Sequence, residues 1–198
     1  MIMKTTTNYK GLLLVLAMIF IAAFSRLIPH LPNFTAVGAM ALFGSAYFYK
    51  KYMAIAAPII ALWISDLAIN NIVYTAQHES FVWFQSYQLY TFLPIILITI
   101  LGFVLFKKVS PAKILSGSIA SSLIFFTISN FGTWLSPFSL FTKDAAGLLN
   151  TYTAALPFLR NEFVATVLFS TVMFSSYYLL TKTFPKLSLN KKVSAVLS

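Results

Sequence analysis

The stretch MAIAAPIIALWISDLAINNIV, residues 53–73, contains one charged side chain, Asp66, in an otherwise apolar run. A helix needs about 20 such residues, at about 1.5 Å each, to cross the hydrocarbon core of a bilayer. The run lacks the alternation of apolar and polar residues that a barrel strand shows, and in lipid every backbone N–H and C=O group must be hydrogen-bonded within the protein. Residues 53–73 therefore predict a membrane-spanning helix that carries an acid.

Five further apolar runs flank this one along the chain. The first two of the six are short and need flanking residues to span. Of the 198 residues, 59% are hydrophobic and 9% are charged, whereas soluble chains carry about a quarter charged residues, so a soluble globular domain is excluded. We predict an all-α integral membrane protein, one domain over residues 1–198, built as a six-transmembrane-helix bundle. The five further runs are 11–24, 34–49, 89–106, 114–134 and 163–180.

The basic residues gather on one side of the expected bundle. The net charge of +10 comes from 14 Lys and Arg against 4 Asp and Glu. Lys and Arg are retained in cytoplasmic loops, so both termini are expected in the cytoplasm, with the first helix retained rather than cleaved as a signal. Attraction to anionic membrane lipid explains the excess, and no nucleic-acid partner is needed. The basic residues of the inner side are Lys4, Lys10, Lys50, Lys51, Lys107, Lys108, Lys113, Lys182, Lys186, Lys191 and Lys192, and those of the outer side are Arg26, Lys143 and Arg160.

Several kinds of chemistry are missing from the chain. It has no cysteine, and it has no P-loop, GxGxxG or HExxH motif. The two histidines have no second ligand at helical spacing, so we expect no metal site, no cofactor and no catalytic residue. An intramembrane enzyme using His30 and Asp66 as acid and base is the least favoured function.

The long connections, and most of the polar residues, lie on the expected outer side. Residues 25–33, 74–88 and 135–161 form these connections, whereas the inner ones are short. Long connections in compact domains are uncommon unless they bind something or form a lid. The outer face is therefore the expected place of function.

Asp66 is the central candidate, in the outer half of its helix. An ionised acid at the centre of a membrane helix costs on the order of 2.5 to 3.5 kcal/mol and normally faces a cavity or a partner. Asn70 follows at i+4 and shares its face. Two interpretations stand: Asp66 binds a ligand, or it forms a structural ion pair with Arg26 or Arg160.

Two other outer regions carry candidates. Helix 114–134 ends in a polar and aromatic tip with Asn130 and Trp134, and residues 77–90 combine His78 with Trp83, Tyr87 and Tyr90. These side chains could wall a large amphipathic ligand. The alternatives are an interfacial aromatic belt, a surface helix, and for Asn130 an inter-helix hydrogen bond.

Four segments, 26–35, 65–67, 129–134 and 156–161, resemble a family of small bacterial six-helix proteins. That family is similar in architecture to the S-components of energy-coupling factor vitamin transporters and to the solitary cobalamin transporters of Gram-negative bacteria. The resemblance implies a multi-pass protein of the bacterial inner membrane, with a pocket open to the periplasm and lined by His30, Asp66, Tyr87 and Arg160.

The chain departs from that pattern in two ways. The cobalamin transporters ligate cobalt with a cysteine where this chain has His78, Glu79 and Ser80. The small residues of the first helix, Ala17 and Ala22, are five apart rather than four, so an energising module is possible but not required.

We expect a non-enzymatic membrane transporter that takes up a vitamin or similar small molecule, with cobalamin or another corrinoid as the implied candidates. Asp66 and Arg160 would supply charge or close the site, and the histidines would hydrogen-bond or coordinate. The aromatic side chains would stack on the ligand. The alternative is a structural or assembly subunit of a membrane protein complex, with Asp66 held in an internal pair.

Overall fold

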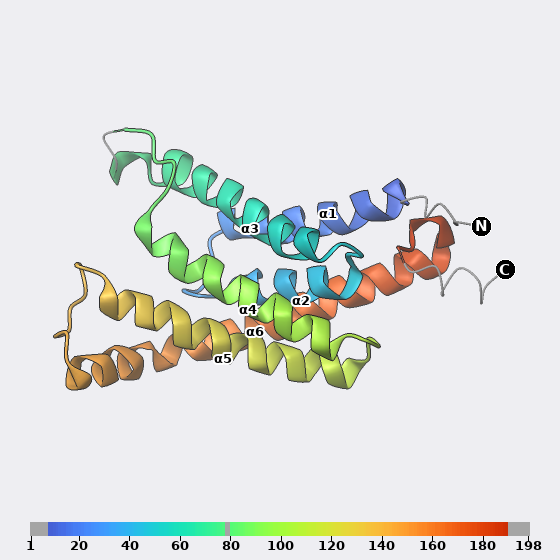
Figure 1. Ribbon diagram of the computed structural model, residues 1–198. Helices are drawn as coiled ribbons and strands as arrows, with labels where there is room; N and C mark the ends of the chain where they lie inside the picture. Colours follow the sequence, from blue (N-terminus) through green and yellow to red (C-terminus); the bar gives the residue numbers. More distant parts are fainter. Residues whose placement is uncertain (1–7, 78–79, 190–198) are drawn as a thin grey trace.

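The computed structural model describes residues 8–77 and 80–189, and within them it contains helices and no strand. Six α-helices make up the bundle (Figure 1), with short 3₁₀ turns at Ser25–Leu27, Thr75–Gln77, Ser86–Gln88 and Pro185–Leu187 and a π-helical turn at Ile69–Val73. The α-helices are α1 (Tyr9–Phe24), α2 (Val37–Tyr47), α3 (Lys51–Ala68), α4 (Leu89–Leu105), α5 (Pro111–Leu135) and α6 (Ala145–Thr183).

Successive helices run in opposite directions, so the connections gather at two ends (Figure 1). One end holds the start of α1, the α2–α3 and α4–α5 connections and the end of α6. It carries eight of the eleven described Lys and Arg, and we call it the lysine-rich end. The other, the loop end, holds residues 25–36, 74–77, 80–88 and 136–144. The eight are Lys10, Lys50, Lys51, Lys107, Lys108, Lys113, Lys182 and Lys186.

Five of the helices in residues 8–77 and 80–189 are long and apolar enough to cross a membrane. With their adjoining turns they cover Tyr9–Leu27, Lys51–Val73, Ser86–Leu105, Pro111–Leu135 and Ala145–Thr183. Large apolar side chains are exposed on α4 and α5, among them Val104 and Leu123. An apolar outer surface of this kind is what lipid requires, and the fold is compatible with a multi-pass membrane protein.

The apolar run at 34–49 gives a shorter helix than its hydropathy predicts. α2 has 11 residues, which is about 16 Å of helix against a core of about 30 Å. Its residues from Val37 to Ser45 are all buried. The apolar character of this run therefore reflects enclosure by protein on every side rather than the length of a membrane span.

Small residues and aromatic rings pack α2 into the centre of the bundle. A side chain at Gly38 would meet the hydroxyls of Ser121 on α5 and Thr166 on α6. Toward the lysine-rich end, the Phe43 ring packs against those of Phe174 and Tyr177 of α6, at centroid separations of 5.4 and 5.7 Å. Small residues let helix backbones approach closely, as packing in lipid requires.

The expected outer connection at 135–161 is mostly helix. α6 has 39 residues and begins at Ala145, where the Asp144 carboxylate accepts a hydrogen bond from the Gly147 N–H at 2.7 Å. The Tyr152 hydroxyl donates to the Thr127 carbonyl of α5 at 2.6 Å. The first half of α6 thus packs along α5, and the connection between them shortens to residues 136–144.

Candidate functional site

A cavity of about 700 Å³ lies at the loop end, between the 25–35 segment, the end of α3 and the turn before α4. It mixes polar side chains with apolar ones. Its lining consists of Arg26, Leu27, Ile28, Pro29, His30, Asn33, Thr35, Asp66, Ile69, Asn70, Val73, Tyr74, Gln85 and Tyr87.

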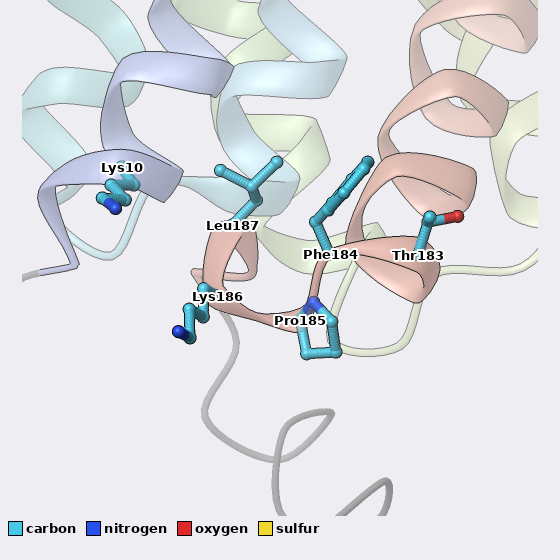
Figure 2. Close-up of a pocket in the computed structure, with 6 residues that line it drawn as sticks. All are labelled: Lys10, Thr183, Phe184, Pro185, Lys186 and Leu187. Carbon is cyan, nitrogen blue, oxygen red and sulfur yellow. The ribbon is translucent and has the colours of Figure 1, made fainter.

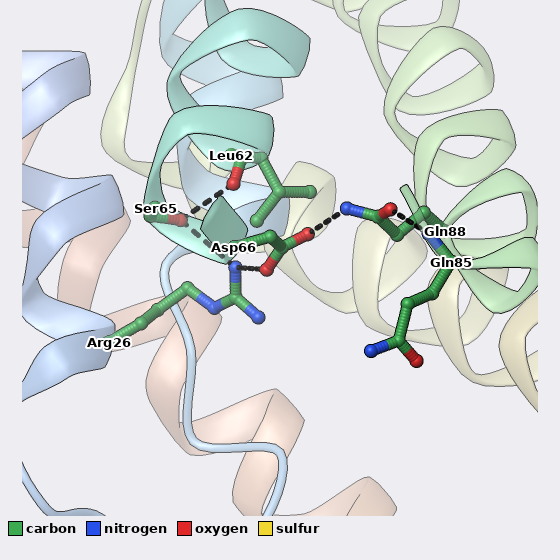
Figure 3. A network of polar contacts seen from close by, with 6 residues as sticks. All are labelled: Arg26, Leu62, Ser65, Asp66, Gln85 and Gln88. Atoms are coloured by element: carbon green, nitrogen blue, oxygen red, sulfur yellow. Dashed lines mark hydrogen bonds and ion pairs between the residues drawn. The ribbon is translucent and has the colours of Figure 1, made fainter. Parts of the chain in front are cut away.

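Asp66 forms an ion pair with Arg26 at this cavity. The Arg26 Nη1 group donates to Asp66 Oδ1 at 2.6 Å and to the Ser65 hydroxyl at 3.1 Å (Figure 3). The Asp66 side chain is 4% exposed, whereas that of Arg26 is 19% exposed. Arg26 lies in the turn directly after α1, and α1 packs on α3, so the helix contact brings the two charges together.

Gln88 donates a hydrogen bond to the other oxygen of the Asp66 carboxylate. Its Nε2 donates to Asp66 Oδ2 at 2.9 Å, and its Oε1 accepts from the Gln85 backbone N–H at 2.6 Å (Figure 3). Both ends of this amide are used, and Gln88 is 1% exposed. It therefore ties the start of α4 to α3 across the site.

Part of the Arg26 guanidinium is uncommitted. A guanidinium has five N–H donors, and only those on Nη1 have acceptors among the described residues. Arg26 lines the cavity and is partly exposed. Its Nε and Nη2 donors are thus available to an acceptor that enters the cavity.

The end of α3 continues into a π-helical turn at Ile69–Val73, which begins about one helical turn after Asp66. Such turns occur frequently at functional sites. Asn70 is buried and lines the cavity, and the Tyr87 hydroxyl has Asp66, Arg26 and Asn70 as electrostatic neighbours.

Asn71 holds the neighbouring loop in place. Its side chain accepts from the Val82 N–H at 2.7 Å and donates to the Val82 carbonyl at 2.9 Å. The Trp63 indole donates to the Trp83 carbonyl at 3.0 Å. These bonds fix residues 82–83 against α3, and so help place Gln85 and Tyr87 at the cavity.

Four of the residues singled out from the sequence come together here. His30, Asp66, Asn70 and Tyr87 line the one cavity. His30 is exposed, and its Nδ1 lies 2.8 Å from the Leu31 carbonyl oxygen. His78 lies outside the described residues.

The remaining candidates lie elsewhere, each with its own contacts. The Trp83 ring is 65% exposed and packs on Phe81. Tyr90 is half-buried and packs against Gly132 of α5. Neither side chain is among those that line the cavity.

The end of α5 and the first half of α6 also stay apart from the cavity. Asn130 donates to the Phe126 carbonyl on its own helix at 2.8 Å, and its side chain has no inter-helix hydrogen bond among the described residues. The Trp134 indole donates to the Thr142 carbonyl at 2.9 Å. Arg160 is exposed on α6 and has no hydrogen bond or ion pair with any described residue, so of the two arginines considered for Asp66 the structure pairs Arg26.

Sequence reasoning named Arg26 only as a structural partner and missed Gln88. A polar residue directly before an apolar run is usually read as a helix start at the membrane surface. The burial of Gln88 depends on the tertiary contact with Asp66, for which its position in the sequence gives no signal.

A second cavity, of about 410 Å³, lies at the lysine-rich end (Figure 2). It contains none of the residues singled out from the sequence. Its lining is Lys10, Thr183, Phe184, Pro185, Lys186 and Leu187.

The loop-end cavity offers charge and hydrogen bonds to a ligand. No group of three or more His, Cys, Asp or Glu side chains among residues 8–77 and 80–189 is arranged to hold a metal ion. The groups that line the cavity are a guanidinium, a carboxylate, amides, phenols and an imidazole beside apolar side chains.

No curated protein matches this chain, and no solved structure matches it either. One protein family does, over residues 6–187, which is most of the chain. The chain therefore belongs to the family described as a family of unknown function (DUF6580).

Proposed function

We propose that this chain is a membrane transporter that binds a small organic solute, a vitamin or a molecule of similar size, in the loop-end cavity. The observation that carries the proposal is Arg26, which holds Asp66 with one nitrogen and leaves its other donors available at a polar cavity in an apolar bundle. Charged groups within membrane segments are costly and mark substrate or ion pathways.

The chemistry of the cavity favours a solute that bears a carboxylate. Guanidinium groups bind carboxylates through parallel N–H donors, and the contact of Arg26 with Asp66 uses Nη1 and leaves the Nε and Nη2 donors for a second carboxylate. A volume of about 700 Å³ falls within the range of small-molecule sites, about 300 to 1,000 Å³. A corrinoid is larger and would extend out of the cavity between the loops, so the cavity suits a smaller vitamin better.

The proposal includes a membrane topology. With six crossings, α2 among them, both termini lie in the cytoplasm of a bacterium and the loop end faces the periplasm. The alternating helix directions and the eight lysines at one end support this orientation. The shortness of α2 is accommodated by its enclosure, because it needs no lipid-facing length.

A second function is favoured by one specific observation. Asp66 has donors on both of its oxygens, Arg26 on one and Gln88 on the other, so the pair is complete without a ligand. This is what a structural or assembly subunit requires of an internal ion pair. The subunit function predicts that no small molecule binds at the cavity.

Thermal unfolding in detergent separates the two functions. The purified protein is heated with a panel of carboxylate-bearing vitamins, their neutral amide or ester analogues, cobalamin and cobinamide. A ligand at 100 times its dissociation constant adds about 2.7 kcal/mol of stability, or about 5 to 10 °C for a chain of this size. We expect a carboxylate to raise the melting temperature and its neutral analogue to have a smaller effect.

Two arginines provide a matched pair of variants. Arg26→Gln should abolish the ligand shift, whereas Arg160→Gln, on an exposed side chain outside the cavity, should retain it. Because Arg26→Gln also weakens the fold, Asn70→Ala tests the cavity with the ion pair intact. A panel without any shift, or a shift that survives both Arg26→Gln and Asn70→Ala, would refute the proposed site.

A further inference from the structure

Glu162 is a second buried acid, and it has no hydrogen bond to the residues of the loop-end ion pair. It lies on α6 and is 1% exposed. The Thr166 hydroxyl donates to its Oε1 at 3.1 Å, and its Oε2 has no hydrogen-bond partner among the described residues. A buried carboxylate without a compensating charge is strongly unfavourable, so this group needs a positive partner.

Hydroxyl groups lie on the Glu162 face of α6 and on the neighbouring helix α5. Thr166 and Ser170 follow it at four-residue spacing and share its face of α6. A side chain at Gly38 would lie 3.1 Å from Thr166 Oγ1 and against the Ser121 hydroxyl, so both hydroxyls converge on the start of α2. The hydroxyl oxygens of Ser121 and Ser170 also lack partners among the described residues.

No cationic side chain of residues 8–77 and 80–189 forms an ion pair with the carboxylate. Thr166 is its one side-chain electrostatic partner, and no titratable or charged group of α2, α5 or residues 32–36 acts on it. Arg160, two residues earlier on α6, is exposed. Carboxylate and hydroxyl oxygens are the ligands of hard cations, and a proton on the carboxyl would equally remove its charge.

We propose that Glu162 binds a monovalent cation, H⁺ or Na⁺, inside the bundle, with Thr166 and Ser121 as the adjacent oxygen ligands. The charge of this cation compensates the buried carboxylate. The site stands on Glu162 and its neighbours alone and does not depend on the solute proposed for the loop-end cavity.

Residues 32–35 connect this cation site to that cavity. The Asn161 side chain, beside Glu162, donates to the Pro32 carbonyl at 3.0 Å, and the Phe34 ring packs on Phe169 with centroids 6.2 Å apart. The alternate residues Asn33 and Thr35 line the cavity. The same short segment therefore packs on α6 with one side and walls the cavity with the other, so cation binding at Glu162 bears on the shape of that wall.

The test uses the full chain in detergent with Na⁺ as the probe. Melting temperatures are measured against NaCl concentration, with choline chloride at equal ionic strength as the reference. A saturable rise specific to Na⁺, lost in Glu162→Gln and kept in Asp144→Asn, establishes a Na⁺ site. Thr166→Val should raise the Na⁺ concentration needed for half of the effect.

The proton is tested by infrared spectroscopy of the carboxyl C=O stretch across a pH titration. If H⁺ is the cation, a protonated carboxyl band that is absent in Glu162→Gln disappears reversibly as the pH rises, while Na⁺ has no specific effect on melting. Glu162→Asp keeps a carboxyl at this position, so a shifted titration midpoint of that band in Glu162→Asp assigns it to Glu162 even where Glu162→Gln folds poorly.

Two results would overturn the proposal. One is the absence of both a Na⁺-specific shift in melting temperature and a carboxyl band that titrates with pH. Glu162 would then be either ionised without a bound cation or permanently neutral. The other is a Na⁺ response that Glu162→Gln retains, which would place the cation elsewhere. Either outcome leaves the vitamin panel unaffected, so failure here and failure of the solute site are distinguishable.

Discussion

Breaking the Arg26–Asp66 pair should cost the fold a measurable part of its stability. In Arg26→Gln the Asp66 carboxylate, 4% exposed, keeps the Gln88 donor but loses its positive partner. Removing one partner of a buried pair costs about 3 to 5 kcal/mol. Because the Arg26 side chain is 19% exposed and borders the cavity, water can hydrate the site, and we expect the low end, about 3 kcal/mol.

The matching substitution on α3 should be milder. Asp66→Asn leaves a guanidinium that is partly exposed and can stay hydrated, so we expect a loss of about 1 to 2 kcal/mol. The double variant restores a neutral pair and should lose no more than Asp66→Asn alone. The two sites are therefore expected to be coupled by about 3 kcal/mol, well above the scatter of independent sites.

The assay is thermal unfolding in detergent, followed by tryptophan fluorescence. For a chain of this size about 3 kcal/mol corresponds to a fall of about 6 to 12 °C in melting temperature. Arg160→Gln, which removes the exposed arginine, should stay within about 0.5 kcal/mol of the wild type. If Arg26→Gln melts like Arg160→Gln, or if the two single losses simply add in the double variant, the ion pair does not stabilise the fold and the reasoning fails.

Two further predictions concern Gln88 and the start of α6. Gln88→Leu leaves Asp66 Oδ2 and the Gln85 N–H without partners and should cost about 1 to 3 kcal/mol in the same melting assay; an unchanged melting temperature would show that the amide bridge is dispensable. At the cap of α6, hydrogen bonds from the Gly147 N–H and the Thr142 hydroxyl hold the pKa of Asp144 below the usual value for an aspartate. A lowered folded-state pKa gives stability that is present above the usual value and lost as the pH falls through the lowered one. Hydrogen exchange should therefore show protection of residues 145–148 that persists at neutral pH and declines only in acid. Asp144→Ala should reduce this protection at all pH values, whereas Asp144→Asn should keep it at neutral pH. Equal protection in wild type and Asp144→Ala would contradict the cap.

Hydropathy predicted the helical class and the approximate extent of α1, α3, α4 and α5, but it could not separate a lipid-facing run from a protein-enclosed one. Residues 34–49 are apolar because α2 is surrounded by other helices, and a run in lipid has the same composition. The first half of α6 was missed for the opposite reason. It mixes polar with apolar residues, since one face packs on α5 through Tyr152, and a search for continuous apolar runs passes over such a helix.

The part of the candidate site that lies on a single helix was predictable from the sequence. Asp66 and Asn70 share a face by spacing alone, and both line the cavity. The partners of Asp66 depend on the contact of α1 with α3 and on the turn that begins α4. Residue spacing along one helix gives no information about these contacts between helices. The aromatic residues Trp83, Tyr90 and Trp134 show the same limit, because composition gives their number but not the direction in which they point.

The short α2 also bears on how such a chain is made. In two-stage assembly each helix first becomes stable across the bilayer by itself and then associates with the others. A helix of 11 residues cannot complete the first stage alone, because it reaches only about half of the hydrocarbon thickness. In the six-crossing topology proposed above, α2 would therefore have to enter the membrane together with α1 or α3, as part of a helical hairpin, and would reach its final place only when the later helices close around it.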